Sequence, residues 1–129
     1  MQQFRDAIDS GDLDSAVALF SDDIVFRSPV VYTPYEGRAQ VEALIRAVAQ
    51  VLEDFRYTRQ IGAPDAADHA LVFQARIGDR EVEGCDFIHV NEAGLIDEFF
   101  VMFRPLSGVL ALAEAMKRQL ELLESAGSS

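Results

Sequence analysis

The chain has a single cysteine, only two histidines and no tryptophan. One cysteine, Cys85, excludes an intrachain disulfide and fits a reducing cytoplasm. Because two distant histidines and one thiol cannot assemble a typical zinc site, we expect no metal, and no motif indicates any other cofactor. Glu81, Glu83 and Asp86 surround Cys85 and disfavour its thiolate, so we interpret Cys85 as a structural thiol.

Positive charge is also scarce, with 11 Lys and Arg against 22 Asp and Glu and a net charge of −11. Because nucleic acids, anionic membranes and polyphosphates bind clustered cations, we expect none of them as partners. The apolar runs are too short to cross a bilayer, and no secretory signal pattern begins the chain. Half of the residues are nevertheless apolar. This predicts an ordinary core and, as partner, a small hydrophobic molecule or a protein.

Periodic apolar patterns predict one α+β domain over residues 1–124, followed by a flexible tail over 125–129. Two short helices come first and meet at Gly11, and Asp12 can cap the second of them. The other expected elements, in chain order, are a strand ending at Pro29, a helix over 38–52, strands over 55–61, 69–77, 81–90 and 95–103, and a helix over 106–124.

Short turns join the last three strands, which predicts an antiparallel meander. The expected architecture is a cone-shaped, curved antiparallel sheet with the N-terminal helices packed on its concave face and a C-terminal helix. The concave face can hold a ligand. Apolar residues at Val72, Val82 and Phe87 are expected on the convex face, and they favour a homodimer formed through it.

Three segments carry a resemblance to a known family: GDLDSAVALFSDDIVFRSP at 11–29, EGR at 36–38 and NEAGLIDEFFVMF at 91–103. In order and spacing the chain resembles the nuclear transport factor two-like superfamily. That superfamily includes ketosteroid isomerases, SnoaL-type polyketide cyclases, limonene epoxide hydrolase and scytalone dehydratase. Because the fold hosts many chemistries and several non-enzymes, the resemblance indicates the fold more firmly than the function.

The resemblance to ketosteroid isomerases is closest in spacing, yet only one of three catalytic positions matches. The resemblance implies a general-base Asp at the position of Ser28 and an oxyanion-binding Tyr at the position of Phe4. It also implies a protonated Asp, which Asp86 provides. A neutral serine cannot abstract a carbon-bound proton, and a phenylalanine cannot donate to an enolate. We therefore expect no ketosteroid isomerase activity.

The other relatives are matched no better. SnoaL-type cyclases carry an acid/base Asp late in the final strand, where this chain has Val101 to Arg104 and no carboxylate beyond Glu98. The epoxide-hydrolase set of an Arg and two Asp residues is not recovered, and Asp86 could match one member only. The reaction type and the substrate therefore stay open.

Asp86 is the most informative residue because it interrupts the apolar half of the strand EVEGCDFIHV. Alternation places Gly84, Asp86 and Ile88 on one face, which the resemblance identifies as concave. In an apolar cavity the pKa of Asp86 should rise, so that it could donate a hydrogen bond or act as a general acid. Alternatively, Asp86 is solvated, or is satisfied by the backbone or a Tyr hydroxyl, or faces outwards because of a bulge at Gly84.

The remaining candidates are expected to line the cavity as ligand-binding residues. Aromatic stripes are more often ordinary core, and Ser28 could simply bond the local backbone. His89 falls on the opposite face from Asp86, His69 is expected at the surface, and Arg104 could bind a ligand carboxylate or pair with an acidic side chain. The expected ligand-binding set is Phe26, Ser28, Tyr32, Tyr35, Phe73, Phe99, Val101 and Phe103.

Two hypotheses follow. The first is an enzyme that applies acid/base chemistry, of an isomerase, cyclase or hydrolase class, to a small hydrophobic neutral substrate, with Asp86 as the candidate catalytic residue. The second is a non-catalytic ligand-binding protein or a dimeric interaction module that lacks the base. A second titratable group beside Asp86 would favour the enzyme, and a solid core without a cavity would leave the interaction module.

Overall fold

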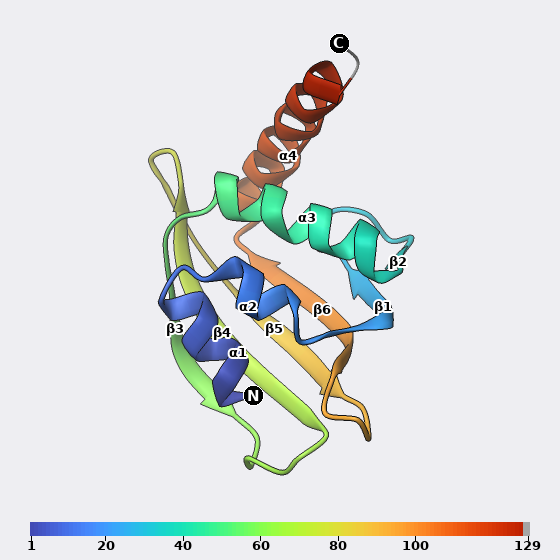
Figure 1. Ribbon diagram of the computed structural model, residues 1–129. Helices are drawn as coiled ribbons and strands as arrows, with labels where there is room; N and C mark the ends of the chain where they lie inside the picture. Colours follow the sequence, from blue (N-terminus) through green and yellow to red (C-terminus); the bar gives the residue numbers. More distant parts are fainter. Residues whose placement is uncertain (128–129) are drawn as a thin grey trace.

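In the computed structural model, which describes residues 1–127, one curved sheet carries helices on its concave face (Figure 1). The helices are α1 (Gln2–Asp9), α2 (Leu13–Val17), α3 (Arg38–Val51) and α4 (Leu106–Gly127). The strands are β1 (Phe20–Arg27), β2 (Tyr35–Glu36), β3 (Glu53–Ile61), β4 (Asp68–Ile77), β5 (Arg80–Val90) and β6 (Ile96–Arg104).

The six strands lie in the order β2-β1-β6-β5-β4-β3. Strands β3 to β6 form an antiparallel meander, and β2 adds to β1 antiparallel. The predicted α+β cone is therefore confirmed, with one difference: β1 pairs with β6 in parallel, an arrangement that the long crossover through α3 and the meander permits. Strand β2 was not predicted from the sequence, since a strand of two residues shows no alternation of polar and apolar side chains.

The two N-terminal helices form a tight pair over the sheet. Gly11 has a φ of 75°, a left-handed conformation that lets the chain turn sharply between α1 and α2. Asp12 caps α2 as expected and accepts hydrogen bonds from the Ser15 amide at 3.2 Å and the Ser15 hydroxyl at 2.6 Å. Phe4 and Phe20 are fully buried between these helices and the sheet.

Two residues lie where the sequence did not place them. Val82, expected on the convex face, is buried beneath α4, where a Cβ built on Gly108 would lie 2.6 Å from Val82 Cγ1. The expectation was wrong because Val82 has the same strand parity as Gly84 and Asp86. His69, expected at the surface, is buried, and its Nε2 lies 2.7 Å from the Ala66 carbonyl oxygen.

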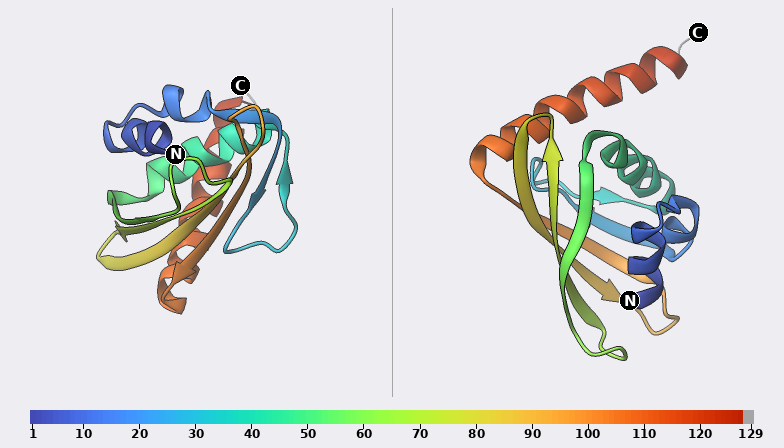
Figure 2. Two further views of the ribbon diagram at one scale, coloured as in Figure 1. Left: turned by 90° about the horizontal axis from the view of Figure 1, so that it is seen from below. Right: turned by 90° about the vertical axis from the view of Figure 1, so that its left-hand side faces the viewer.

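Helix α4 packs against α3 and the meander of its own chain, and its later turns extend away from the body of the molecule (Figures 1 and 2). It continues past the expected domain end at residue 124 as far as Gly127. The last two residues of the expected flexible tail, 128–129, lie outside the described residues. No helix in residues 1–127 is long and apolar enough to span a membrane.

Candidate functional site

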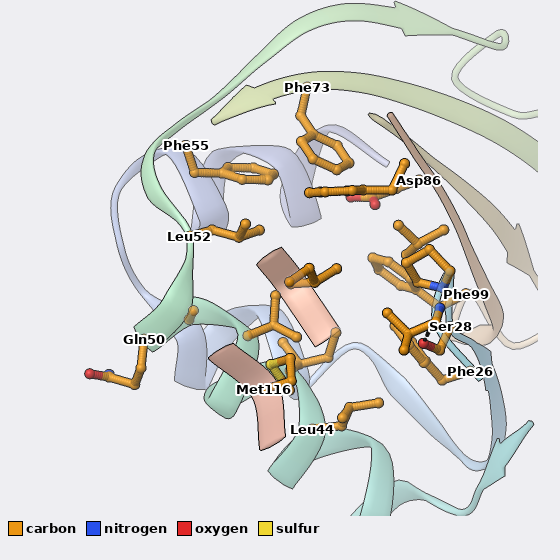
Figure 3. Close-up of a pocket in the computed structure, with 18 of the residues that line it drawn as sticks. Phe26, Ser28, Leu44, Gln50, Leu52, Phe55, Phe73, Asp86, Phe99 and Met116 are labelled. Atoms are coloured by element: carbon orange, nitrogen blue, oxygen red, sulfur yellow. Dashed lines mark hydrogen bonds between the residues drawn. The ribbon is translucent and has the colours of Figure 1, made fainter. Parts of the chain in front are cut away.

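A cavity of about 620 Å³ opens between the concave face of the sheet and the helices, within the size range of small-molecule sites (Figure 3). The strands supply one wall, α3 and α4 supply the opposite wall, and α1 contributes Phe4 and Ile8. Most of the lining is aliphatic or aromatic. Polar groups are few, and they include Ser28, Tyr57 and Asp86.

Asp86 faces this cavity from the middle of β5. It lies opposite Leu71 of β4 and Val101 of β6, and the β4–β5 register is unbroken across Gly84, so no bulge reverses its direction. The side chain is 5% exposed. Its Oδ2 accepts a hydrogen bond of 2.8 Å from the Tyr57 hydroxyl of β3. The structure therefore combines two of the alternatives, a cavity-facing carboxyl and one partnered by a tyrosine.

Burial dominates the electrostatics of this pair. Removing Asp86 from water raises its pKa to about 7, although the hydrogen bond from Tyr57 works in the opposite direction. Burial, together with the nearby charge of Asp86, raises the pKa of Tyr57 well above 10.0, so the phenol keeps its proton. Near neutral pH, Asp86 can thus exist in both forms, which is the property that a general acid or base requires.

An aromatic wall holds Tyr57 over Asp86. The Tyr57 ring meets Phe55 edge to face at a centroid separation of 5.0 Å, and Phe55 stacks on Phe73 at 4.9 Å. Gly84 makes room for Phe73, because a Cβ at Gly84 would lie 2.6 Å from Phe73 Cζ and 2.3 Å from the Met102 carbonyl oxygen. The absence of a side chain at Gly84 therefore sets the position of the wall that surrounds the Tyr57–Asp86 pair.

The structure brings together all but one of the expected ligand-binding residues. Tyr32 does not belong to the lining: its side chain is 100% exposed, because the loop after Pro29 directs Val30 and Val31 to the cavity instead. The Ser28 hydroxyl lines the cavity but accepts hydrogen bonds from the Val30 amide at 3.0 Å and the Val31 amide at 3.4 Å. The residues found in the lining are Phe26, Ser28, Tyr35, Phe73, Phe99, Val101 and Phe103.

Sequence reasoning missed Tyr57 and the helical wall. Alternation in the strand FRYTRQI puts Phe55 and Tyr57 on one face, and this signal could have placed Tyr57 in the cavity. The apolar stripe of α4 was visible in the sequence, but its packing partner was not. The residues of α3 and α4 in the lining are Leu44, Ile45, Val48, Ala49, Gln50, Leu112, Ala113, Met116, Lys117 and Leu120.

The other titratable candidates lie outside the cavity. His89 Nδ1 lies 2.6 Å from Asp97 Oδ1, and Asp97 raises the pKa of this imidazole. Arg104 pairs with Glu83 rather than facing the cavity. Among the described lining residues, Asp86 is the one carboxylate, and Tyr57 is the titratable group within its reach.

Comparisons with known proteins agree with this geometry. A family described as the SnoaL-like domain matches residues 1–99. A solved structure described as a steroid delta-isomerase from Pseudomonas aeruginosa is 39% identical with a TM-score of 0.90, covering 96% of this chain and 90% of that chain. An uncharacterised bacterial protein with a cystatin-like fold from Silicibacter pomeroyi is 36% identical with a TM-score of 0.86, covering 93% and 84%.

A more distant structure, an NTF-2 like protein of unknown function from Burkholderia xenovorans, shares the fold alone. It is 16% identical with a TM-score of 0.66, covering 79% of this chain and 77% of that chain. No curated protein matches the sequence significantly.

Proposed function

Because the chain belongs to the SnoaL-like family of the nuclear transport factor two-like superfamily, we propose that it binds a small, hydrophobic, neutral molecule in this cavity. Asp86 is the polar anchor of the ligand. The observation that carries the proposal is a carboxyl group, 5% exposed, in a largely apolar cavity of about 620 Å³. Burying such a group costs free energy, which ligand recognition would explain better than folding does.

We further propose that Asp86 is an acid/base group for a reaction of the isomerase, cyclase or hydrolase class. With a pKa of about 7, it can donate a proton to a ligand oxygen in one form and accept one in the other. Tyr57 is a positioning residue here, because its hydroxyl is directed at Asp86 Oδ2. Among the residues that the structure describes, the lining offers no second carboxylate, which favours a mechanism in which one group exchanges the proton.

The same lining argues against the steroid isomerase route, despite the similarity to the steroid delta-isomerase from Pseudomonas aeruginosa. Ser28 stands where that route needs a base, and its hydroxyl is occupied by the backbone amides of Val30 and Val31. Phe4 stands where the route needs a tyrosine, and it packs against Phe99 at 5.7 Å. We propose that the chain is not a working ketosteroid isomerase.

A screen of apolar ketones, phenols, lactones and epoxides by thermal shift tests this proposal. A ligand at about 100 times its dissociation constant adds roughly 2.7 kcal/mol of stability, which is several degrees in Tm for a domain of this size. We expect hits with the wild type, weakened in Asp86→Ala and retained in the exposed control Tyr32→Phe. A β,γ-unsaturated ketosteroid included in the screen should keep its double bond at the original position.

The ligand proposal would be refuted by a screen without hits, or by hits whose thermal shift is unchanged in Asp86→Ala. Double-bond isomerisation at a rate lost in Asp86→Ala would refute the proposed absence of steroid isomerase activity. Hits without turnover of any compound would favour a non-catalytic binding protein. This is the second candidate because Asp86 is the one carboxylate among the described residues of the lining.

We also propose a homodimer, in a cytoplasmic setting that fits the single cysteine. The convex patch, defined as Val72, Cys85, Phe87, Phe100 and Met102, lies on the outer face of β4, β5 and β6. Strand register sets Cys85 beside Val72 and Met102, and the rings of Phe87 and Phe100 lie 6.1 Å apart. Phe87 is 40% and Met102 52% exposed, so a contiguous apolar surface faces outwards.

Sedimentation velocity at micromolar concentration checks the dimer. The wild type should sediment as a dimer and Met102→Glu as a monomer, because a charge buried without a partner in an interface is costly. Ile61→Glu places the same charge on an exposed residue outside the patch and should leave the dimer intact. A monomeric wild type would refute the proposal.

A further inference from the structure

The Tyr57–Asp86 pair leaves one carboxyl oxygen for a ligand. Tyr57 donates to Oδ2, and within residues 1–127 Asp86 makes no side-chain hydrogen bond through Oδ1. Oδ1 is not fully enclosed by the protein, so it has access to the cavity that Asp86 lines. A ligand in the cavity therefore meets Oδ1 as the carboxyl oxygen that has no hydrogen-bond partner within residues 1–127, framed by apolar side chains.

The chemical character of this atom depends on its proton. Protonated at Oδ1, Asp86 donates a hydrogen bond, which suits the lone pair of a carbonyl oxygen. When Asp86 is ionised, it can only accept hydrogen bonds, which suits the O–H of a phenol or enol. Its lone pairs then repel those of a ketone oxygen. Because the cavity has so few polar groups, a ligand oxygen and Asp86 Oδ1 that cannot hydrogen-bond to each other find few other hydrogen-bond partners.

We propose that this pair makes the cavity selective for the hydrogen-bond polarity of its ligand, so that carbonyl compounds bind to the protonated carboxyl, phenols or enols bind to the carboxylate, and the preference reverses with pH. The inference rests on the proposed function, since it requires an apolar ligand in this cavity. It narrows the ligand class to compounds with one oxygen that is either a ketone or an acidic hydroxyl. Tyr57 determines the specificity by reserving Oδ2.

Few other ionisable groups can disturb the reversal. Arg5 and Asp9 of α1 act on Tyr57 through space with opposite signs. Cys85, on the other face of β5, keeps its proton because burial and Asp86 raise its pKa. In the described part of the chain, Tyr35 of β2 and the exposed Lys117 of α4 complete the titratable side chains of the lining, to which α2, α3, β1, β4 and β6 contribute none.

Menthone and thymol test the proposal, because they share one carbon skeleton and carry a ketone and a phenol oxygen at the same position. Isothermal titration calorimetry would measure both affinities at pH 6 and pH 8.5. With a pKa of about 7 for Asp86, the protonated fraction falls about thirtyfold over this range. We expect the affinity for menthone to fall by roughly that factor and the affinity for thymol to rise by up to about tenfold.

Three variants identify the group responsible. Asp86→Asn keeps a side chain that can donate and accept, so both ligands should bind with little pH dependence. Tyr57→Phe removes the hydrogen bond that lowers the Asp86 pKa, so the reversal should move to higher pH, a change that a purely structural role would not produce. Tyr32→Phe makes the same chemical change at a fully exposed site and should leave the wild-type reversal intact.

Parallel pH profiles for the two ligands in the wild type would overturn the polarity inference and leave the proposed function standing. A reversal that persists in Asp86→Asn would overturn it as well. Absence of binding by both ligands and by every ketone and phenol of the thermal-shift screen would overturn the proposed function together with the inference.

Discussion

Replacing Asp86 with asparagine should stabilise the protein relative to the wild type as the pH rises, by up to about 4 kcal/mol between pH 4 and pH 8. The cause is the burial of the carboxyl group, which raises its pKa from 3.8 to about 7. Between these two values the folded wild type binds a proton that the unfolded chain has released. Asparagine has no proton to lose and can still accept the hydrogen bond from Tyr57.

The sign of the effect follows from that proton. The contribution of Asp86 to stability is fully present below pH 3.8 and is lost as the pH rises through about 7. Guanidinium unfolding of the wild type and Asp86→Asn across this range measures the difference directly, and about 4 kcal/mol corresponds to roughly 10–15 °C in Tm. Asp65→Asn, at an exposed loop position, removes the same charge and should change stability little at any pH. Equal pH profiles for the wild type and Asp86→Asn would show that Asp86 ionises freely in the fold.

Adding one methyl group at Gly84 should destabilise the protein by about 3 kcal/mol, the upper part of the range for overpacking. The new Cβ would lie 2.3 Å from the Met102 carbonyl oxygen and 2.6 Å from the Phe73 ring. Neither neighbour can withdraw easily, because Met102 belongs to the paired backbone of β6, and Phe73 stacks on Phe55 and packs at a tilt against Phe103. The aromatic wall would have to shift, so ligand binding should weaken as well.

Gly108→Ala is the matched control. Its new Cβ would meet Val82 Cγ1 at 2.6 Å, but this neighbour is the end of a side chain. Alanine also favours the helix by about 1 kcal/mol, which offsets part of the strain. Chemical unfolding should therefore place Gly108→Ala within about 1 kcal/mol of the wild type, far from Gly84→Ala. If both variants lost a similar amount of stability, β5 and β6 would be able to move apart at Gly84. The close approach of Phe73 and the Met102 carbonyl to Gly84 would then not define the cavity.

The fold and the anchor of the site could be predicted because their signals are local. Strand alternation alone directs Asp86 and Ile88 to one face, and both are buried there. The same rule, applied with the wrong parity, put Val82 on the convex face. Tyr32 lies in a loop, where no period relates one side chain to the next, so its direction could not be inferred.

The partner of Asp86 could not be read in this way, because it depends on the curvature of the sheet. Strand β4 separates β3 from β5, so Tyr57 and Asp86 are not neighbours in the ladder. Register irregularities in β3 before Arg56 and after Tyr57 bend this edge strand over the concave face. The hydrogen bond between Tyr57 and Asp86 spans strand β4 along the concave face, and it depends on that bend, which no residue-by-residue pattern encodes.

The parallel pairing of β1 with β6 also governs the order in which the molecule can assemble. Phe26 lies beside Phe99 in the sheet, although most of the chain separates them, and their rings stack at 5.6 Å. Closing so long a loop costs entropy before any contact forms, whereas the turns of the meander close cheaply. The meander can therefore form early, whereas β1 can pair only after β6, near the other end of the chain, has formed. We therefore expect the ligand cavity, which needs both β1 and the meander, to be completed in the last steps of folding.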